Sequence, residues 1–130
     1  MLLAFDTATS AVTVALHDGS AVVAESTVVD PLRHGELLAP GIAHVLSTVS
    51  ARSRDVTRIA VGVGPGPFTG LRVGLVTARM MAFALDVPLL GVCTLDVVAA
   101  AVTRDEEIAA SDWVLPTVTE AVDVVLDGAW

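Results

Sequence analysis

The sequence has 130 residues, of which 54% are apolar and 17% are charged. A domain of this size buries about two-thirds of the surface that its unfolded chain exposes, so the composition excludes a disordered protein and allows one core. The longest stretch without a charged residue, 37–51, has 15 residues, fewer than the about 18–20 that a membrane span needs. Cys93 is the single cysteine, which excludes an internal disulfide. We therefore expect a soluble, cytoplasmic protein without a membrane partner.

The net charge of −8 is unevenly distributed along the chain. Residues 1–104 hold 8 acids and 7 arginines, whereas residues 105–130 hold 7 acids and no base. The sequence has no lysine, and its arginines are scattered. Because nucleic-acid binding needs clustered positive charge, we expect no direct binding of nucleic acid.

The N-terminal segment predicts two or three antiparallel strands. Leu2–Asp6 is a short apolar run, and apolar residues alternate with small ones from Val12 to Leu16, which is the period of a strand. Asp18-Gly19 follows as a hairpin turn, and Ala21–Val29 is the expected return strand.

Helices and strands then alternate. Apolar residues at helical spacing predict an amphipathic helix over Arg33–Val49, in which Pro40 and Gly41 should weaken or kink the first turns. The further expected elements are a strand at Ile59–Val63, a helix at Leu71–Leu85, a strand at Pro88–Cys93 and a helix at Leu95–Val102 with Thr94 as its N-cap. A hairpin followed by alternating elements predicts an α/β fold with a mixed sheet flanked by helices.

The acidic C-terminal segment has its own pattern. Thr117-x-x-Glu120 is a capping-box sequence, and apolar residues follow at helical spacing until Gly128. This pattern predicts a short helix within residues 104–130.

Two segments are candidates for chemistry. The first is Asp6-Thr7-Ala8-Thr9-Ser10, where an acid and small hydroxyls follow a strand. Such a turn can hold a phosphate or a metal-bound water, and Asp6, Thr7 and Thr9 are the candidate cofactor-binding residues. The alternative is an ordinary turn whose hydroxyls bond the backbone.

The second segment is the loop at 62–74, rich in glycine and proline, which leads from a strand into a helix. Pro65 and Pro67 lack N–H groups, so the loop is a poor phosphate cradle, and it matches neither a P-loop nor a dinucleotide fingerprint. A column of small residues continues into the helix at every fourth position: Gly70, Gly74, Ala78 and Ala82. This column favours close approach, either to the chain's own sheet or to another subunit.

Other reactive side chains do not form a recognisable set. His34 and Glu36 do not share a helical face, and no second histidine stands four residues from His34, so we expect no metal site. We expect His17 to be exposed and Cys93 to lie in the core, and no serine has a nucleophile-elbow context. We therefore predict that the chain contains no catalytic residues.

Four motifs in order resemble the TsaB (YeaZ) family. They are Met1–Ser10 with its Asp6-Thr7-x-Thr9 turn, Arg33-His34-x-Glu36-x-Leu38-x-Pro40, Gly64-Pro65-Gly66-Pro67-Phe68-Thr69-Gly70-Leu71-Arg72-Val73-Gly74, and Pro88–Asp96. The resemblance covers residues 1–103. It implies an actin-like, ribonuclease-H-like ATPase fold and a role in making N6-threonylcarbamoyladenosine (t6A) in tRNA.

The resemblance also implies partners. Family members act as non-catalytic scaffold subunits that pair with TsaD and TsaE, and they self-associate when alone. The implied pairing surface uses the helices expected at 33–49 and 71–85. Its residues here would be His34, Leu38, Ile42, Gly70, Leu71, Gly74 and Ala78.

The sequence departs from the family after residue 103. Members have a second lobe, which residues 104–130 do not match, and an actin-like nucleotide cleft lies between two lobes. We therefore expect no cofactor in this chain alone and ATP only in an assembled complex. Two alternatives stay open: a degenerate actin-like phosphotransferase or hydrolase that uses Asp6 and Thr9, and a remnant that folds without joining a complex.

Overall fold

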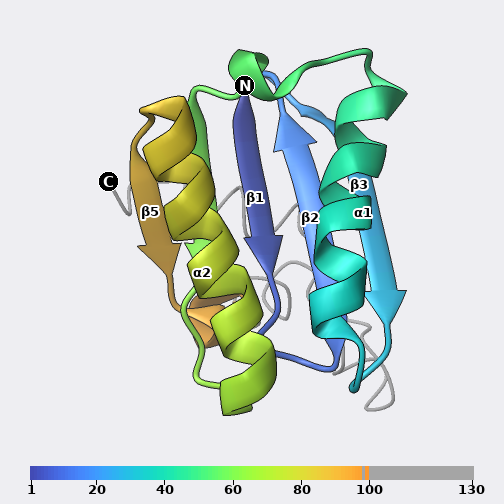
Figure 1. Cartoon of the computed structure of the whole chain (residues 1–130), viewed down its shortest axis with the longest axis vertical. Helices are drawn as coiled ribbons and strands as arrows, with labels where there is room; N and C mark the ends of the chain where they lie inside the picture. The colour runs from blue at the N-terminus through green and yellow to red at the C-terminus, as the bar shows by residue number, and fades with distance from the viewer. Residues whose placement is uncertain (98, 100–130) are drawn as a thin grey trace.

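One mixed sheet of five strands organises the computed structural model, which describes residues 1–97 and 99 (Figure 1). The strands are β1 (Leu2–Asp6), β2 (Ala11–His17), β3 (Val22–Val29), β4 (Arg58–Gly62) and β5 (Leu89–Val92). Their order across the sheet is β3-β2-β1-β4-β5. Strands β1, β2 and β3 pair antiparallel, whereas β1, β4 and β5 pair parallel. This arrangement confirms the predicted α/β fold with a mixed sheet.

The turn between β2 and β3 is the predicted Asp18-Gly19 hairpin turn. Asp18 Oδ1 accepts hydrogen bonds from the N–H groups of Ser20 (2.8 Å) and Ala21 (2.9 Å), and Gly19 has a φ of +105° that favours glycine. The expectation that His17 is exposed is wrong. Its side chain is buried at the end of β2, where Nδ1 accepts the Gly19 N–H at 2.9 Å.

Helix α1 (His34–Thr48) covers β2 and β3. Helix α1 continues through Pro40, so the proline that was expected to weaken or kink it does not end it. Pro40 lies on the exposed face, while the opposite face is buried through Leu38, Ile42, Val45 and Leu46. Gly41 lets α1 approach β2 closely, because a Cβ there would lie 3.2 Å from Val14 Cγ2. Packing of this face therefore outweighs the helix-breaking tendency of proline.

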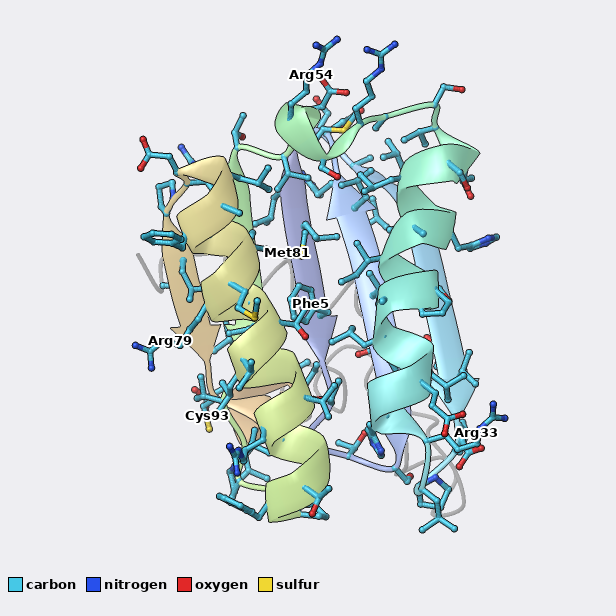
Figure 2. All side chains as sticks on the ribbon, in the orientation of Figure 1. Phe5, Arg33, Arg54, Arg79, Met81 and Cys93 are labelled. Carbon is cyan, nitrogen blue, oxygen red and sulfur yellow. The ribbon has the colours of Figure 1, made fainter. Side chains whose placement is uncertain are left out.

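Helix α2 (Phe68–Leu85) lies beside α1 on the same face of the sheet, over β4 and β1 (Figure 1). It begins three residues before the predicted start, since the Pro67 carbonyl already accepts the Leu71 N–H at 3.0 Å. The main core lies between the two helices and the sheet and includes Phe5, which Figure 2 labels between them. A smaller cluster on the opposite face contains Leu2, Ala4, Ala15, Ala60, Val92 and Val97.

The small-residue column of α2 faces inward. Gly70, Gly74 and Ala78 are the buried residues of this helix. The Thr7 hydroxyl donates to the Gly70 carbonyl at 2.6 Å and accepts the Gly74 N–H at 3.0 Å. It thus bridges two groups that an α-helix usually joins directly. Of the two alternatives for the column, the structure favours packing on the chain's own sheet.

The chain after β5 is described only in part. Residues 94–97 and 99 are helical, so this helix begins one residue before the start expected at Leu95. The short helix expected within 104–130 and the division of the chain after residue 103 lie outside the described residues.

The contact between Thr7 and α2 predicts that Gly74→Ala destabilises the fold. A Cβ at this position would lie 2.6 Å from Thr7 Oγ1, and overpacking of this kind costs about 1–3 kcal/mol. Thermal unfolding followed by circular dichroism should show a melting temperature lowered by roughly 3–18 °C. The matched control is Gly35→Ala, where a Cβ would meet only Val73 Cγ2 at 4.0 Å, so it should melt no lower than the parent. Equal melting temperatures for both variants would contradict the inward packing of Gly74.

Candidate functional site

The candidate site lies where the parallel strands β1, β4 and β5 end. Asp6 is the last residue of β1, and both of its carboxylate oxygens accept hydrogen bonds. Oδ1 accepts the Ala8 N–H at 2.7 Å, and Oδ2 accepts the Thr94 hydroxyl at 2.8 Å. The carboxylate therefore fixes the turn after β1 to the segment after β5.

Thr94 also joins this network to the glycine-rich loop. Its Oγ1 accepts the Gly64 N–H at 3.1 Å, and its own N–H donates to the Gly64 carbonyl at 3.0 Å. The expectation that Thr94 is an N-cap is corrected: its hydroxyl bonds Asp6 and Gly64, and the N–H groups of Asp96 and Val97 instead donate to the Cys93 carbonyl. Cys93 is only partly buried, contrary to the expected core position.

Two glycines of the loop are required by contact with the first turn. A Cβ at Gly62 would collide with the Asp6 carboxylate, and a Cβ at Gly66 would collide with the Ala8 carbonyl. Gly64 adds a φ of +87°, a conformation that favours glycine. The motif therefore lets the loop lie directly on the Asp6–Ser10 turn.

Burial raises the pKa of the Asp6 carboxyl above its ordinary value, because a buried carboxylate loses hydration. The hydrogen bonds from Ala8 and Thr94 act in the opposite direction. Exposed Asp18 behaves differently, since the N–H groups of Ala21 and Ser20 lower its pKa. The pKa of Asp6 is thus raised and that of Asp18 is lowered from the ordinary value.

Thr9 and His34 connect the same turn to α1. His34 Nε2 lies 2.7 Å from the Thr9 carbonyl oxygen, and because a carbonyl only accepts, Nε2 carries the proton. Thr9 Oγ1 accepts the Ala11 N–H at 3.1 Å. The Asp6–Ala8 and Thr9–Ala11 bonds are the side-chain-to-backbone hydrogen bonds expected of an ordinary turn.

A cavity of about 350 Å³ opens beside this turn, between the first residues of α1 and α2. It brings together four of the residues singled out from the sequence: Thr7, Thr9, His34 and Gly70. Thr69, Ser10 and Leu32 are among its other lining residues. Asp6 does not line the cavity, so the three residues of the candidate cofactor site are divided between two environments.

The remaining expected interface residues lie within the fold. Leu38 and Ile42 are buried in the main core, and Leu71 lies half-buried with its methyl groups toward Gly64. The outer face of α2 carries instead a row of exposed apolar side chains: Val76, Met80 and Phe83, here called the α2 ridge. Their i, i+4, i+7 spacing, opposite the small-residue column, is the sequence signal that could have identified them.

Within residues 1–97 and 99, no group of three or more His, Cys, Asp or Glu side chains could hold a metal ion. One described helix, α2, is long and apolar enough by composition to cross a membrane. The inner face of that helix packs on the sheet through Gly70, Gly74 and Ala78.

A family model described as "TsaD: tRNA N6-adenosine threonylcarbamoyltransferase" matches residues 29–119. An uncharacterized protein of Mycobacterium tuberculosis is 40% identical over 107 residues, which are 80% of this chain and 50% of that protein. The tRNA threonylcarbamoyladenosine biosynthesis protein TsaB of Escherichia coli is 36% identical over 103 residues, covering 79% of this chain and 44% of that protein.

Among solved structures, YeaZ from Pseudomonas aeruginosa aligns with a TM-score of 0.76 at 37% identity. The alignment covers 81% of this chain and 49% of YeaZ. The chain therefore spans about half the length of these relatives or less.

The raised pKa of Asp6 predicts a pH-dependent stability difference. A folded-state pKa above the unfolded one stabilises the fold at low pH, and this contribution is lost as the pH rises through the folded-state pKa. Asp6→Asn does not titrate, so its free energy of unfolding relative to the parent should increase as the pH rises from about 3 to 7. Urea unfolding at several pH values measures this trend.

Asp18→Asn provides the control for the Asp6 experiment. Since the pKa of Asp18 is lowered, its contribution is present above the unfolded-state pKa and is lost as the pH falls through the folded-state value. The stability of Asp18→Asn relative to the parent should therefore decrease as the pH rises. If the relative stability of both variants changed in the same direction with pH, the raised pKa of Asp6 would be contradicted.

Proposed function

The chain belongs to the TsaB (YeaZ) family, within the wider TsaD family, and we propose that it is a non-catalytic scaffold subunit for t6A formation in tRNA. In this proposal it acts in the cytoplasm, pairs with a TsaD homologue that performs the transfer, and works with a TsaE homologue. Without these partners it forms a homodimer. ATP acts only in the assembled complex, and tRNA contacts the partners.

The observation that carries the proposal is the α2 ridge. Phe83 is 90% exposed, Met80 67% and Val76 48%. Soluble domains seldom leave a contiguous apolar surface of this kind without an interaction partner. The side chains follow one face of one helix, so they suit packing against a helix of another subunit.

The inward packing of Gly70, Gly74 and Ala78 refines the contact surface. These residues hold α2 against Thr7 and the sheet. The partner surface that we propose is therefore the outer face of α2. The small-residue column packs on the opposite side and holds the helix in place.

The alternative enzyme would use Asp6 and Thr9. Both oxygens of the Asp6 carboxylate accept short internal hydrogen bonds, and Thr9 Oγ1 accepts the Ala11 N–H. A catalytic carboxylate must instead reach the substrate or its proton. This geometry favours the scaffold over the phosphotransferase or hydrolase.

Met80→Asp should abolish binding to the TsaD homologue of the same organism, because a partner would bury an unpaired charge. The full-length variant is tested by co-purification with the tagged TsaD homologue, and circular dichroism confirms folding. Val29→Asp is the matched control, since Val29 is 54% exposed on β3 and lies outside both the α2 ridge and the cavity. It should bind like the parent. Equal binding by both variants would exclude the ridge as the contact, and no binding by the parent would exclude the pairing.

A further inference from the structure

Two arginines accompany the apolar side chains on the outer face of α2. At about 100° per residue around a helix, Arg72 and Arg79 lie within roughly 60° of Val76 and on the same side of it. Both arginines are exposed, and Arg79 projects outward from the helix (Figure 2). Residues 68–85 contain no acid. The α2 ridge is therefore bordered along one side by positive charge alone.

Neither arginine is neutralised within the described fold. The Arg72 guanidinium lies 5.4 Å from the centroid of the Phe68 ring, an uncharged partner that leaves its positive charge in place. Within residues 1–97 and 99, Arg33 pairs with Glu36 at 3.0 Å, whereas no acid forms an ion pair with Arg72 or Arg79. The two charges are therefore available to carboxylates of another molecule.

A partner helix that fits this surface needs two properties. Its apolar side chains must meet Val76, Met80 and Phe83, because covering these exposed groups removes apolar surface from water. Its flanking positions must supply carboxylates to Arg72 and Arg79, because covering a positive charge without a counter-charge costs free energy. A neutral or basic helix with the same apolar row meets only the first requirement.

A second copy of the chain also meets only the first requirement. When a two-fold axis pairs one helix face with itself in antiparallel direction, the same flank of both helices lies on the same side of the contact. With Met80 on the axis, Arg79 of one copy therefore lies beside Arg79 of the other. Apolar contact holds the proposed homodimer together, and the like charges make it weaker than a pair with an acidic partner.

We infer that the α2 ridge is selective for a helix whose apolar row is flanked by carboxylates, which pair with Arg72 and Arg79. The inference rests on the proposed function and specifies its partner: the docking helix of the TsaD homologue carries acidic residues at these positions. Such a helix displaces the second copy, so the two arginines rank the heterodimer above the homodimer.

An anionic membrane also offers negative charge together with an apolar interior. Recognition of such a membrane usually takes a cluster of about 4–8 basic residues. Helix α2 carries two, and the net charge of the chain is −8, which repels an anionic surface. The charge pattern therefore favours a protein helix over a lipid surface.

Two helix-stabilised synthetic peptides test the selectivity on the full chain. Both carry leucine at i, i+4 and i+7 on an alanine background, and they differ only at the flanking positions, which are glutamate in one and glutamine in the other. Fluorescence anisotropy at physiological salt measures their Kd. The glutamate peptide should bind about two- to tenfold more tightly. Equal binding, or tighter binding of the glutamine peptide, would overturn the inference.

Removal of the two arginines identifies the groups responsible. Arg72→Gln combined with Arg79→Gln should abolish the preference for the glutamate peptide. The control combines Arg52→Gln with Arg54→Gln, at exposed arginines outside α2 (Figure 2 labels Arg54), and should keep the preference. Both double variants have the same net charge, so long-range electrostatic effects are matched. Loss of the preference in both, or in neither, would contradict the role of Arg72 and Arg79.

Self-association gives a second readout, with an effect of opposite sign. Arg79→Gln removes like charges from the homodimer, so sedimentation of the chain alone should show about two- to fivefold tighter self-association. The same change should weaken binding of the tagged TsaD homologue by a similar factor. Opposite effects are expected because Arg79 faces an arginine in one complex and a carboxylate in the other. Effects in the same direction on both complexes would overturn the inference.

The peptides also separate this inference from the proposed function. A glutamate preference that depends on Arg72 and Arg79, without capture of the TsaD homologue by any variant, would support the selectivity and contradict the proposed function. Capture of the homologue without a glutamate preference would support the proposed function and overturn the selectivity. Sedimentation of the chain with phosphatidylglycerol vesicles, without a glutamate preference, would assign this face to a membrane and also overturn the selectivity.

Discussion

The Asp6 carboxylate is the contact on which the arrangement of the site depends. It lies against Gly62, at the end of β4, and accepts hydrogen bonds from Ala8 and Thr94. One side chain thereby ties together the ends of three neighbouring parallel strands. Burial raises its pKa, so the fold holds a carboxylate in an environment that disfavours its charge. The glycine at position 62 is required because any Cβ would occupy the space of the carboxylate.

The turn after β1 also fixes which face of α2 packs on the sheet. Thr7 follows Asp6, and its hydroxyl contacts the backbone of α2 at Gly70 and Gly74. This contact turns the small residues of the helix toward the sheet and leaves Val76, Met80 and Phe83 on the outside. A turn suited to phosphate binding in other proteins here positions a helix, and the helix carries the apolar surface on which the proposed assembly relies.

Helix α2 is apolar on two faces: one is buried against the sheet, and the other is exposed. Its composition alone also fits a membrane span. Its inner face is nevertheless buried through Gly70, Gly74 and Ala78, both glycines contact Thr7, and the helix also carries the exposed Arg72 and Arg79. Exposed apolar side chains beside arginine are typical of contacts between proteins. In the proposed assembly, the partner subunit binds this surface through Val76, Met80 and Phe83.

Sequence alone determined the mixed α/β fold and the Asp18-Gly19 turn, because alternation, helical spacing and turn chemistry are local properties of the chain. The family was identified by the resemblance of four motifs in order. It also identified the Asp6–Ser10 turn, the 62–74 loop and the small-residue column as the informative segments. Only the tertiary structure decided what these segments contact. The hydrogen bond from Thr94 to Asp6 joins residues 88 positions apart. The burial of His17, and of the side of α2 that carries Gly74, depends on neighbouring elements. Such contacts form when elements pack, so no periodicity within one segment encodes them.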